Sequence, residues 1–174
     1  MSLKIYVTNL EAYNSGHLVG GWLDLTEFDD GAEIGEAIKK ITKGADEYAI
    51  HDHEGLGPFY SEHLNGDDLY NIVESFHECA RLGIEWDLFC EWCDDCGYDM
   101  DDHSSFKDAF VGEYDTFRDY AEQFLDELYL HDVPESIRYY IDYDAFARDL
   151  AFDHTCIETN CKVSGRMVAV FRNN

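Results

Sequence analysis

The chain has 174 residues, of which 38 are Asp or Glu and 12 are Lys or Arg, so its formal net charge is −26. Hydrophobic residues make up 45% of the sequence and aromatic residues 15%, which is too much apolar surface for a disordered polyelectrolyte. The chain must therefore fold against strong self-repulsion. The scarcity of Lys and Arg disfavours direct binding to nucleic acid or to an anionic membrane surface.

The start of the chain favours a protein of the cytoplasm. Residues 1–7 lead directly into an alternating apolar pattern without the character of a signal peptide, and no apolar run approaches the roughly 18 residues that indicate a membrane span. Six cysteines without a secretion signal indicate reduced thiols rather than a disulfide framework. We therefore expect a cytoplasmic protein.

The negative charge is concentrated in the middle of the chain. Residues 44–137 contain 26 acidic and three basic residues, a formal charge of −23, whereas the other 80 residues contain 12 acidic and nine basic ones. A general adaptation for solubility would spread the charge more evenly. We call residues 44–137 the acidic band and expect it to be functional.

The first 60 residues predict a small sheet with one helix. The segments whose β-branched and aromatic residues indicate strands are residues 5–10, 19–25 and 47–53. A turn is indicated at residues 13–16, and residues 32–43 place apolar side chains on one helical face that ends at Gly44. The Gly55–Pro58 segment predicts a domain boundary near residue 60.

Residues 61–104 predict an acidic, helical middle domain. Asp67 suits the N-cap of a helix whose apolar residues recur at helical spacing, and Gly83 suits its C-terminal end. A second helix is indicated over residues 85–96. The segment from Gly97 to Lys107 is mostly acidic or polar and predicts a loop between domains.

Residues 105–174 predict a C-terminal α+β domain. Its clearest helix spans residues 114–130, with Leu128 on the apolar face and a stripe of carboxylates on another face. Pro134 suits the first turn of a short helix, and a further helix is indicated over residues 144–150. The closing strands are expected around Ile157 and over residues 167–171, with a turn at Ser164-Gly165.

The predicted fold is therefore α+β. We expect an elongated chain of three small domains, which are residues 1–60, 61–104 and 105–174. An elongated shape would separate the charges and relieve their repulsion.

Cys90, Cys93 and Cys96 have C-x2-C-x2-C spacing, which raises the question of zinc or an iron–sulfur cluster. A distant second pair of ligands, which would make such a site a strong prediction, is missing. On a helix, the same spacing places the three thiols on one broad face, as in a packed core. We favour core packing, and a small metal-binding module that uses this cluster stays open as an alternative.

No catalytic site is recognisable in the sequence. His51-Asp52 and His131-Asp132 resemble dipeptides of metal phosphohydrolases, but the first lies in a strand pattern. The acidic run that begins at Asp99 lacks both the glycine and the bidentate glutamate of an EF-hand loop. We therefore expect neither enzymatic activity nor a cofactor.

The acidic band has the charge of a short DNA duplex. B-form DNA carries about one negative charge per 1.7 Å of its axis, so a charge of −23 corresponds to about 40 Å, or roughly a dozen base pairs. A symmetric dimer would double this length. Such a surface can occupy the positively charged groove of a DNA-binding protein. The carboxylates that we expect to form it are Asp87, Glu91, Asp94, Asp95, Asp99, Asp101, Asp102, Asp115, Asp119, Glu122 and Asp126.

Several segments together resemble the antirestriction protein ArdA family. These segments are Ile5–Leu10 followed by Tyr13-Asn14, Leu18–Trp22, Glu47–Asp52, Tyr139–Leu150 and Val170–Arg172. They are spread over nearly the whole chain, and Tyr139–Leu150 is the longest of them.

The resemblance implies a homodimer joined through its C-terminal domain. It also implies DNA mimicry that occupies the DNA site of type I restriction-modification enzymes, at their methyltransferase core, and so protects incoming mobile DNA from restriction. Whether modification is blocked as well stays open. An acidic adaptor for a basic DNA-binding protein is an alternative that differs only in the partner.

The C-terminal motif would then supply the dimer contact or the core of the third domain. Its anchor-like residues are Tyr139, Tyr140, Tyr143 and Phe146. Arg148 would pair with a nearby carboxylate.

Overall fold

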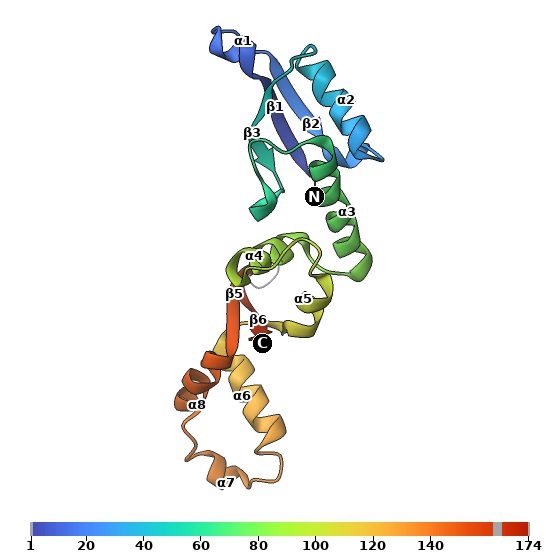
Figure 1. Ribbon diagram of the computed structural model, residues 1–174. Coiled ribbons are helices and arrows are strands. Elements are labelled where there is room, and N and C mark those ends of the chain that lie inside the picture. Colours follow the sequence, from blue (N-terminus) through green and yellow to red (C-terminus); the bar gives the residue numbers. More distant parts are fainter. Residues whose placement is uncertain (1, 162–164, 174) are drawn as a thin grey trace. The chain divides into compact units, whose positions relative to one another are not determined.

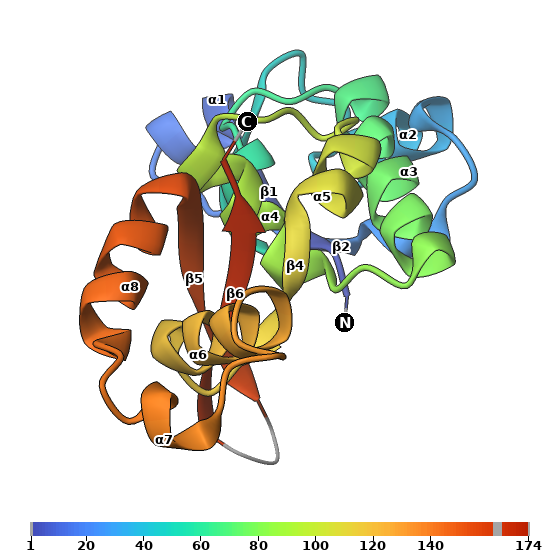
Figure 2. The same cartoon turned by 90° about the horizontal axis from the view of Figure 1, so that it is seen from below.

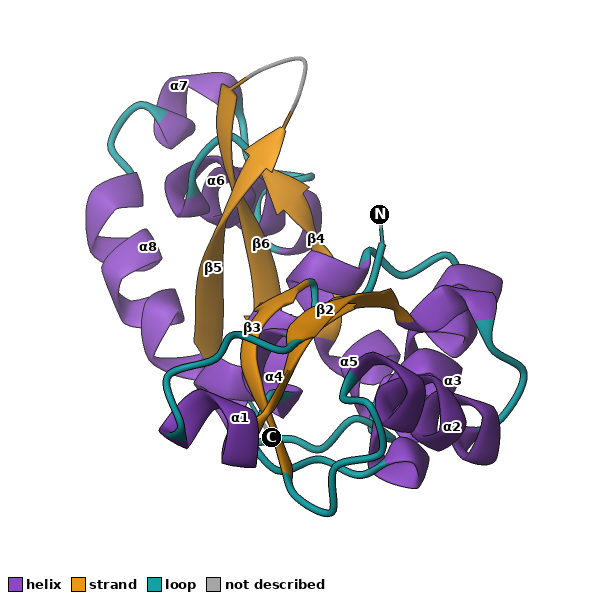
Figure 3. Ribbon diagram, turned by 90° about the horizontal axis from the view of Figure 1, so that it is seen from above, coloured by secondary structure: helices purple, strands orange, loops and turns teal. Residues whose placement is uncertain are grey.

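The computed structural model describes residues 2–161 and 165–173, which divide into two compact units, with the boundary in the sequence between His103 and Ser104 (Figure 1). Each unit contains one antiparallel three-stranded sheet together with helices (Figure 3). The predicted α+β class is confirmed. The unit boundary lies beside the boundary expected at residue 104, and a further division near residue 60 stays a prediction.

The sheet of the first unit has the strand order β2-β1-β3. Its strands are β1 (Lys4–Asn9), β2 (Gly20–Asp24) and β3 (Tyr48–Glu54), close to the predicted segments. Ile5 and Val7 of β1 and Leu23 of β2 are buried, and they alternate with more exposed residues as a half-buried sheet requires. One face of the sheet therefore carries the core of this unit.

Helices α2 and α3 contribute the other side of that core. The helical segments of the first unit are α1 (Leu10–Asn14), η1 (Leu25–Glu27), α2 (Gly31–Ile41), η2 (Gly57–Phe59), α3 (Gly66–Leu82) and α4 (Trp86–Cys96). The sequence had indicated Asp67 as the N-cap of α3. This prediction is wrong, because the N-cap is Asn65. Gly83 adopts a left-handed conformation with φ of 72° and ends α3 as predicted.

The predicted loop between Gly97 and Lys107 is wrong in its second half. Helix α5 (His103–Ala109) begins there. The segment is mostly polar, but Phe106 and Ala109 are buried and give the helix an apolar side.

The sheet of the second unit has the order β4-β6-β5, with helices α6 and α8 beside it (Figure 2). Its elements are β4 (Phe110–Tyr114), α6 (Phe117–Leu128), α7 (Glu135–Arg138), α8 (Tyr143–Leu150), η3 (Ala151–Asp153), β5 (His154–Cys161) and β6 (Gly165–Arg172). The two closing strands are confirmed. The turn expected at Ser164-Gly165 falls partly outside the described residues.

The helix predicted over residues 114–130 is shorter than expected. Thr116 is its N-cap, and the preceding residues form strand β4, which pairs with β6. Pro134 was expected in the first turn of a short helix. It lies one residue earlier, at the N-cap of α7. Throughout the described residues, no helix is long and apolar enough to cross a membrane.

Candidate functional site

Helix α4 carries an apolar face and a carboxylate face. Asp87, Glu91, Asp94 and Asp95 are exposed, and at about 100° per residue they fall within one quarter to one third of the helix circumference. The buried residues of α4 occupy the rest, and they are Trp86, Leu88, Phe89, Cys90, Trp92 and Cys93. Core packing thus fixes the orientation of α4 and holds its four carboxylates toward solvent.

No cation of the described residues forms an ion pair with these four carboxylates. Desolvation raises the pKa of Glu91, and the charges of Asp87 and Asp95, one turn away on either side, raise that pKa further. Like charges one turn apart cost about 0.2–0.5 kcal/mol per pair in an isolated helix. An arrangement that opposes helix stability is more typical of a functional surface than of a solvated helix face.

The segment after α4 continues the carboxylate surface. Asp99 and Asp101 are exposed, and the Asp99 backbone N–H donates to the Asp102 carboxylate at 3.0 Å. Asp99 and Asp101 also line an open cleft of about 710 Å³ together with Glu74 and Glu78 of α3. The acidic surface of the first unit therefore extends from α4 to the beginning of α5.

A buried polar contact holds this cleft in place. Ser75 on α3 donates its hydroxyl hydrogen to the Met100 carbonyl at 2.7 Å. The Ser75 oxygen then serves as an acceptor for Nε2 of His103, which lies 3.1 Å away, so the ring proton is assigned to Nε2. The His103 ring stacks on Phe89 of α4 with centroids 4.8 Å apart. Sequence patterns did not single out Ser75 or His103 for this role.

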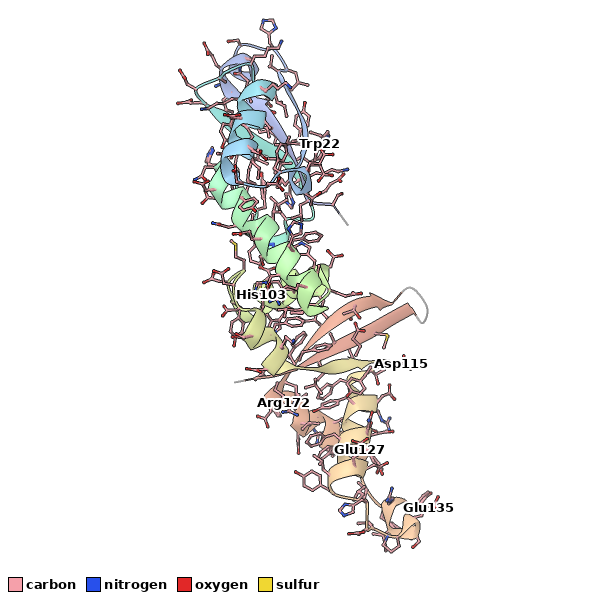
Figure 4. All side chains as sticks on the ribbon, turned by 90° about the vertical axis from the view of Figure 1, so that its right-hand side faces the viewer. Trp22, His103, Asp115, Glu127, Glu135 and Arg172 are labelled. Atoms are coloured by element: carbon pink, nitrogen blue, oxygen red, sulfur yellow. The ribbon has the colours of Figure 1, made fainter. Side chains whose placement is uncertain are left out.

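The carboxylate stripe predicted on one helix of the second unit is broken. Asp115 lies between β4 and α6 (Figure 4), whereas Asp119, Glu122 and Asp126 lie within the residue range of α6. Asp119 belongs to the N-terminal cap, because its carboxylate accepts the Thr116 hydroxyl at 2.6 Å. These residues do not form one uniform helical face.

Basic and phenolic groups offset the other two carboxylates of this stripe. Arg118 donates to Glu122 at 2.8 Å and also pairs with Asp144 of α8 at 3.0 Å. Asp126 accepts the Tyr143 hydroxyl at 2.9 Å, and this hydrogen bond is the first cause of the raised pKa of Tyr143. The α6 carboxylates are therefore partly used to hold α6 against α8.

The aromatic residues of the C-terminal motif fall into two pairs. Tyr139 and Tyr140 are 88% and 82% exposed, and their rings contact each other edge to face. Tyr143 and Phe146 instead pack within the unit, with Phe146 against Phe124 of α6. The first pair is therefore the more exposed of the two.

Arg138, which sequence reasoning did not single out, orders the segment before these tyrosines. Its guanidinium donates to the carbonyls of Val133 and Leu130 and lies 3.7 Å from the Asp126 carboxylate. Arg148 has a weaker role, since it lies 3.6 Å from the adjacent Asp149 and both side chains are exposed. Leu128, expected on an apolar helix face, is exposed, as are Tyr129 and Ile137.

The cysteines of α4 belong mostly to the core. Cys90 and Cys93 are buried, as is Cys79 of α3, and Cys96 is half-buried. Burial raises the pKa of Cys79 and of Cys93 to about 12 and also raises that of Cys90, as is typical of thiols packed in an apolar core. In the part of the chain that the structure describes, no group of three or more His, Cys, Asp or Glu residues is arranged to hold a metal ion.

Comparison with known proteins connects these observations to one family. The sequence model of the family described as antirestriction protein (ArdA) matches residues 5–163, which include most of both units. The comparison with curated proteins found no match. Because the family match covers far more than half of the chain, this protein belongs to the ArdA family of antirestriction proteins.

Proposed function

We propose that this antirestriction protein is a DNA mimic that occupies the DNA-binding groove of a type I restriction-modification enzyme, at its methyltransferase core. Restriction of incoming mobile DNA is blocked as a result. The observation that carries the proposal is the carboxylate face of α4, which no cation of the described residues pairs with, inside an acidic band of −23.

The physical basis is competition for the same cations. A DNA-binding groove presents Lys and Arg side chains and gains affinity when counterions are released from the bound polyanion. Carboxylates held on a packed helix offer these cations a fixed array of negative charge. Inhibition then follows from occupancy alone, so the protein needs no catalytic residue and acts in a stoichiometric complex.

The two acidic regions contribute unequally in this proposal. Asp87, Glu91, Asp94 and Asp95 are free of internal ion pairs in the described structure and form the principal contact, continued by Asp99, Asp101 and Asp102. Glu122 and Asp126 already interact with Arg118 and Arg138, so α6 contributes less. Tyr139 and Tyr140 are the proposed contact between the two copies of a homodimer.

The test is a competition assay between this protein and DNA for a purified type I methyltransferase core. We expect stoichiometric displacement of DNA that weakens as NaCl is added. The quadruple variant D87N/E91Q/D94N/D95N should require at least about a tenfold higher concentration to displace DNA. Each exposed ionic contact contributes about 0–1 kcal/mol, and the variant removes four of them.

The matched control is D115N/D119N/E122Q/D126N, which removes the same formal charge from the second unit. A smaller loss is expected here. Undisturbed DNA binding in excess wild-type protein rules the proposal out. Equal inhibition of an unrelated basic DNA-binding protein would favour the acidic-adaptor alternative instead.

A further inference from the structure

The outer face of the N-terminal sheet exposes an aromatic pair. Trp22 of β2 and Tyr6 of β1 are register partners, and their rings contact each other edge to face with centroids 5.6 Å apart. Leu23, the neighbour of Trp22, points to the opposite face, where α2 packs on the sheet. Trp22, which is labelled in Figure 4, is 47% exposed by its accessible surface.

This pair is flanked by carboxylates in register. Tyr6 lies opposite Asp52 on β3, so Trp22, Tyr6 and Asp52 form one row across the three strands. Asp24, Lys4 and Glu54 form the next row. With three carboxylates and one ammonium group, the face has a net negative charge beside two π systems.

The second row contains a basic residue, and the first row contains none. In the second row, Lys4 lies between Asp24 and Glu54, and the Asp24 carboxylate also accepts hydrogen bonds from the backbone and hydroxyl of Thr26. In the first row, no cation of the described residues forms an ion pair with Asp52, and its Oδ1 accepts the adjacent His53 backbone N–H at 2.8 Å. Within the described part of the chain, Asp52 and the aromatic pair therefore have no cationic partner.

We propose that this aromatic face, Trp22, Tyr6 and Asp52, is a second interaction surface that binds an arginine side chain from an extended segment of a partner protein. Adjacent strands lie about 4.8 Å apart, so a guanidinium group over Tyr6 and Trp22 can direct its N–H groups at Asp52. The planar guanidinium stacks on aromatic rings and pairs with a carboxylate in two-point geometry, which an ammonium group cannot do.

Charge complementarity favours a cationic partner over the other occupants. A second copy of the same face would oppose its own net negative charge, and DNA would be repelled by both the face and the chain. The inference is independent of the DNA-mimic proposal, because that proposal depends on carboxylates of α4 and not on exposed aromatic rings.

The fluorescence of Trp22 provides a local readout in the full chain. The other two tryptophans, Trp86 and Trp92, are buried, so acrylamide quenching reports chiefly on Trp22. The probes are capped glycine-rich pentapeptides that contain either two arginines or two lysines. Titrations at about 0.15 M NaCl screen long-range attraction to the acidic band, while a direct contact with Asp52 is screened much less.

We expect the arginine peptide to shield Trp22 from acrylamide and to bind about 3- to 30-fold more tightly than the lysine peptide. The D52N variant should abolish this preference. The control E36Q removes the same charge from α2, on the opposite side of the sheet, and should retain it. W22L tests the aromatic ring itself by calorimetry, with thermal unfolding as a check of its fold.

Equal shielding by both peptides would overturn the inference, as would an unchanged preference in D52N. If Trp22 became less accessible to acrylamide as the protein concentration rose in the absence of peptide, the face would be assigned to contact with a second copy instead. Competition with DNA for the methyltransferase core should be the same in D52N as in wild type, so the two proposals fail separately.

Discussion

Asn65 shows how a single position determines the beginning of a helix. Its side chain accepts the backbone N–H groups of Asp67 at 2.9 Å and of Asp68 at 3.0 Å, and the Asp68 carboxylate accepts the Asn65 N–H in return. Asn65→Ala should therefore lower the free energy of unfolding by about 1 kcal/mol. Urea denaturation measures this loss.

Asp67→Ala is the matched comparison, because Asp67 lies inside the helix and caps nothing. It should cost less, since it removes only the attraction between a carboxylate and the helix N-terminus. Equal losses in the two variants would contradict the assigned cap.

Glu91 has an unfavourable charge in the folded protein. Its pKa is raised by desolvation first and then by Asp87 and Asp95, so ionisation of Glu91 lowers stability above the raised pKa, and this cost disappears below the ordinary carboxyl pKa. Glu91→Gln should therefore stabilise the protein at pH 7 by about 0.5 kcal/mol and have little effect at acidic pH. Thermal unfolding across the pH range checks both parts.

The control for this prediction is Glu36→Gln. Glu36 lies four residues before Lys40 on α2, which is the favourable order for opposite charges. This variant should not stabilise the protein at pH 7. A gain in E36Q equal to that in E91Q would mean that total charge matters and local repulsion does not.

At the scale of elements, the contact between α2 and α3 depends on the absence of a side chain at Gly66. A Cβ atom there would lie 2.1 Å from the Gly31 carbonyl oxygen and 3.0 Å from the Gly35 nitrogen. Gly66→Ala should therefore separate the two helices and destabilise the first unit by about 1–3 kcal/mol.

Gly35→Ala, on the other helix of this contact, predicts the opposite sign. A Cβ at Gly35 meets no atom within 4 Å, and the position lies inside α2. Alanine should stabilise the protein here by about 0.5–1 kcal/mol, because it restricts the unfolded chain and favours the helix. Calorimetry of both variants tests the pair, and destabilisation by G35A would show that the contact is closer than described.

Local patterns predicted most elements, and the failures have a common physical cause. Strand β4 is short, contains Gly112, and exists because it pairs with β6 more than fifty residues later. Helix α5 is stabilised by Phe106 and Ala109 within a polar segment. Both depend on tertiary contacts, which local periodicity does not contain.

The same limit applies to the candidate site. Asp87, Glu91 and Asp95 were expected on the acidic surface without a stated face, and the structure exposes them on one face of α4. The regular spacing on α6 gave no sign that Arg138 and Tyr143 would approach Asp126, because they follow it by twelve and seventeen residues. The carboxylates of α4 and those of α6 therefore differ in their side-chain partners from other elements, and these partners could not be predicted from local spacing.

At the scale of the whole molecule, the division into units sharpens the distribution of charge. The first unit contains 24 acidic and five basic residues, a formal charge of −19, and the second contains 14 acidic and seven basic residues, a charge of −7. Several of the described ion pairs lie in the second unit, including those of Arg118 and Arg138. Uncompensated repulsion is therefore concentrated in the unit that carries α4.

This imbalance predicts that salt stabilises the protein. Raising NaCl from about 0.02 M to about 0.2 M shortens the Debye length from roughly 20 Å to less than 10 Å and screens repulsion across the first unit. Calorimetry should show an unfolding temperature that rises by several degrees. The D87N/E91Q/D94N/D95N variant, which has four fewer charges to screen, should show a smaller rise. A temperature that falls with salt would mean that attractive ion pairs outweigh the repulsion, and the carboxylate face of α4 would then have no energetic cost for function to explain.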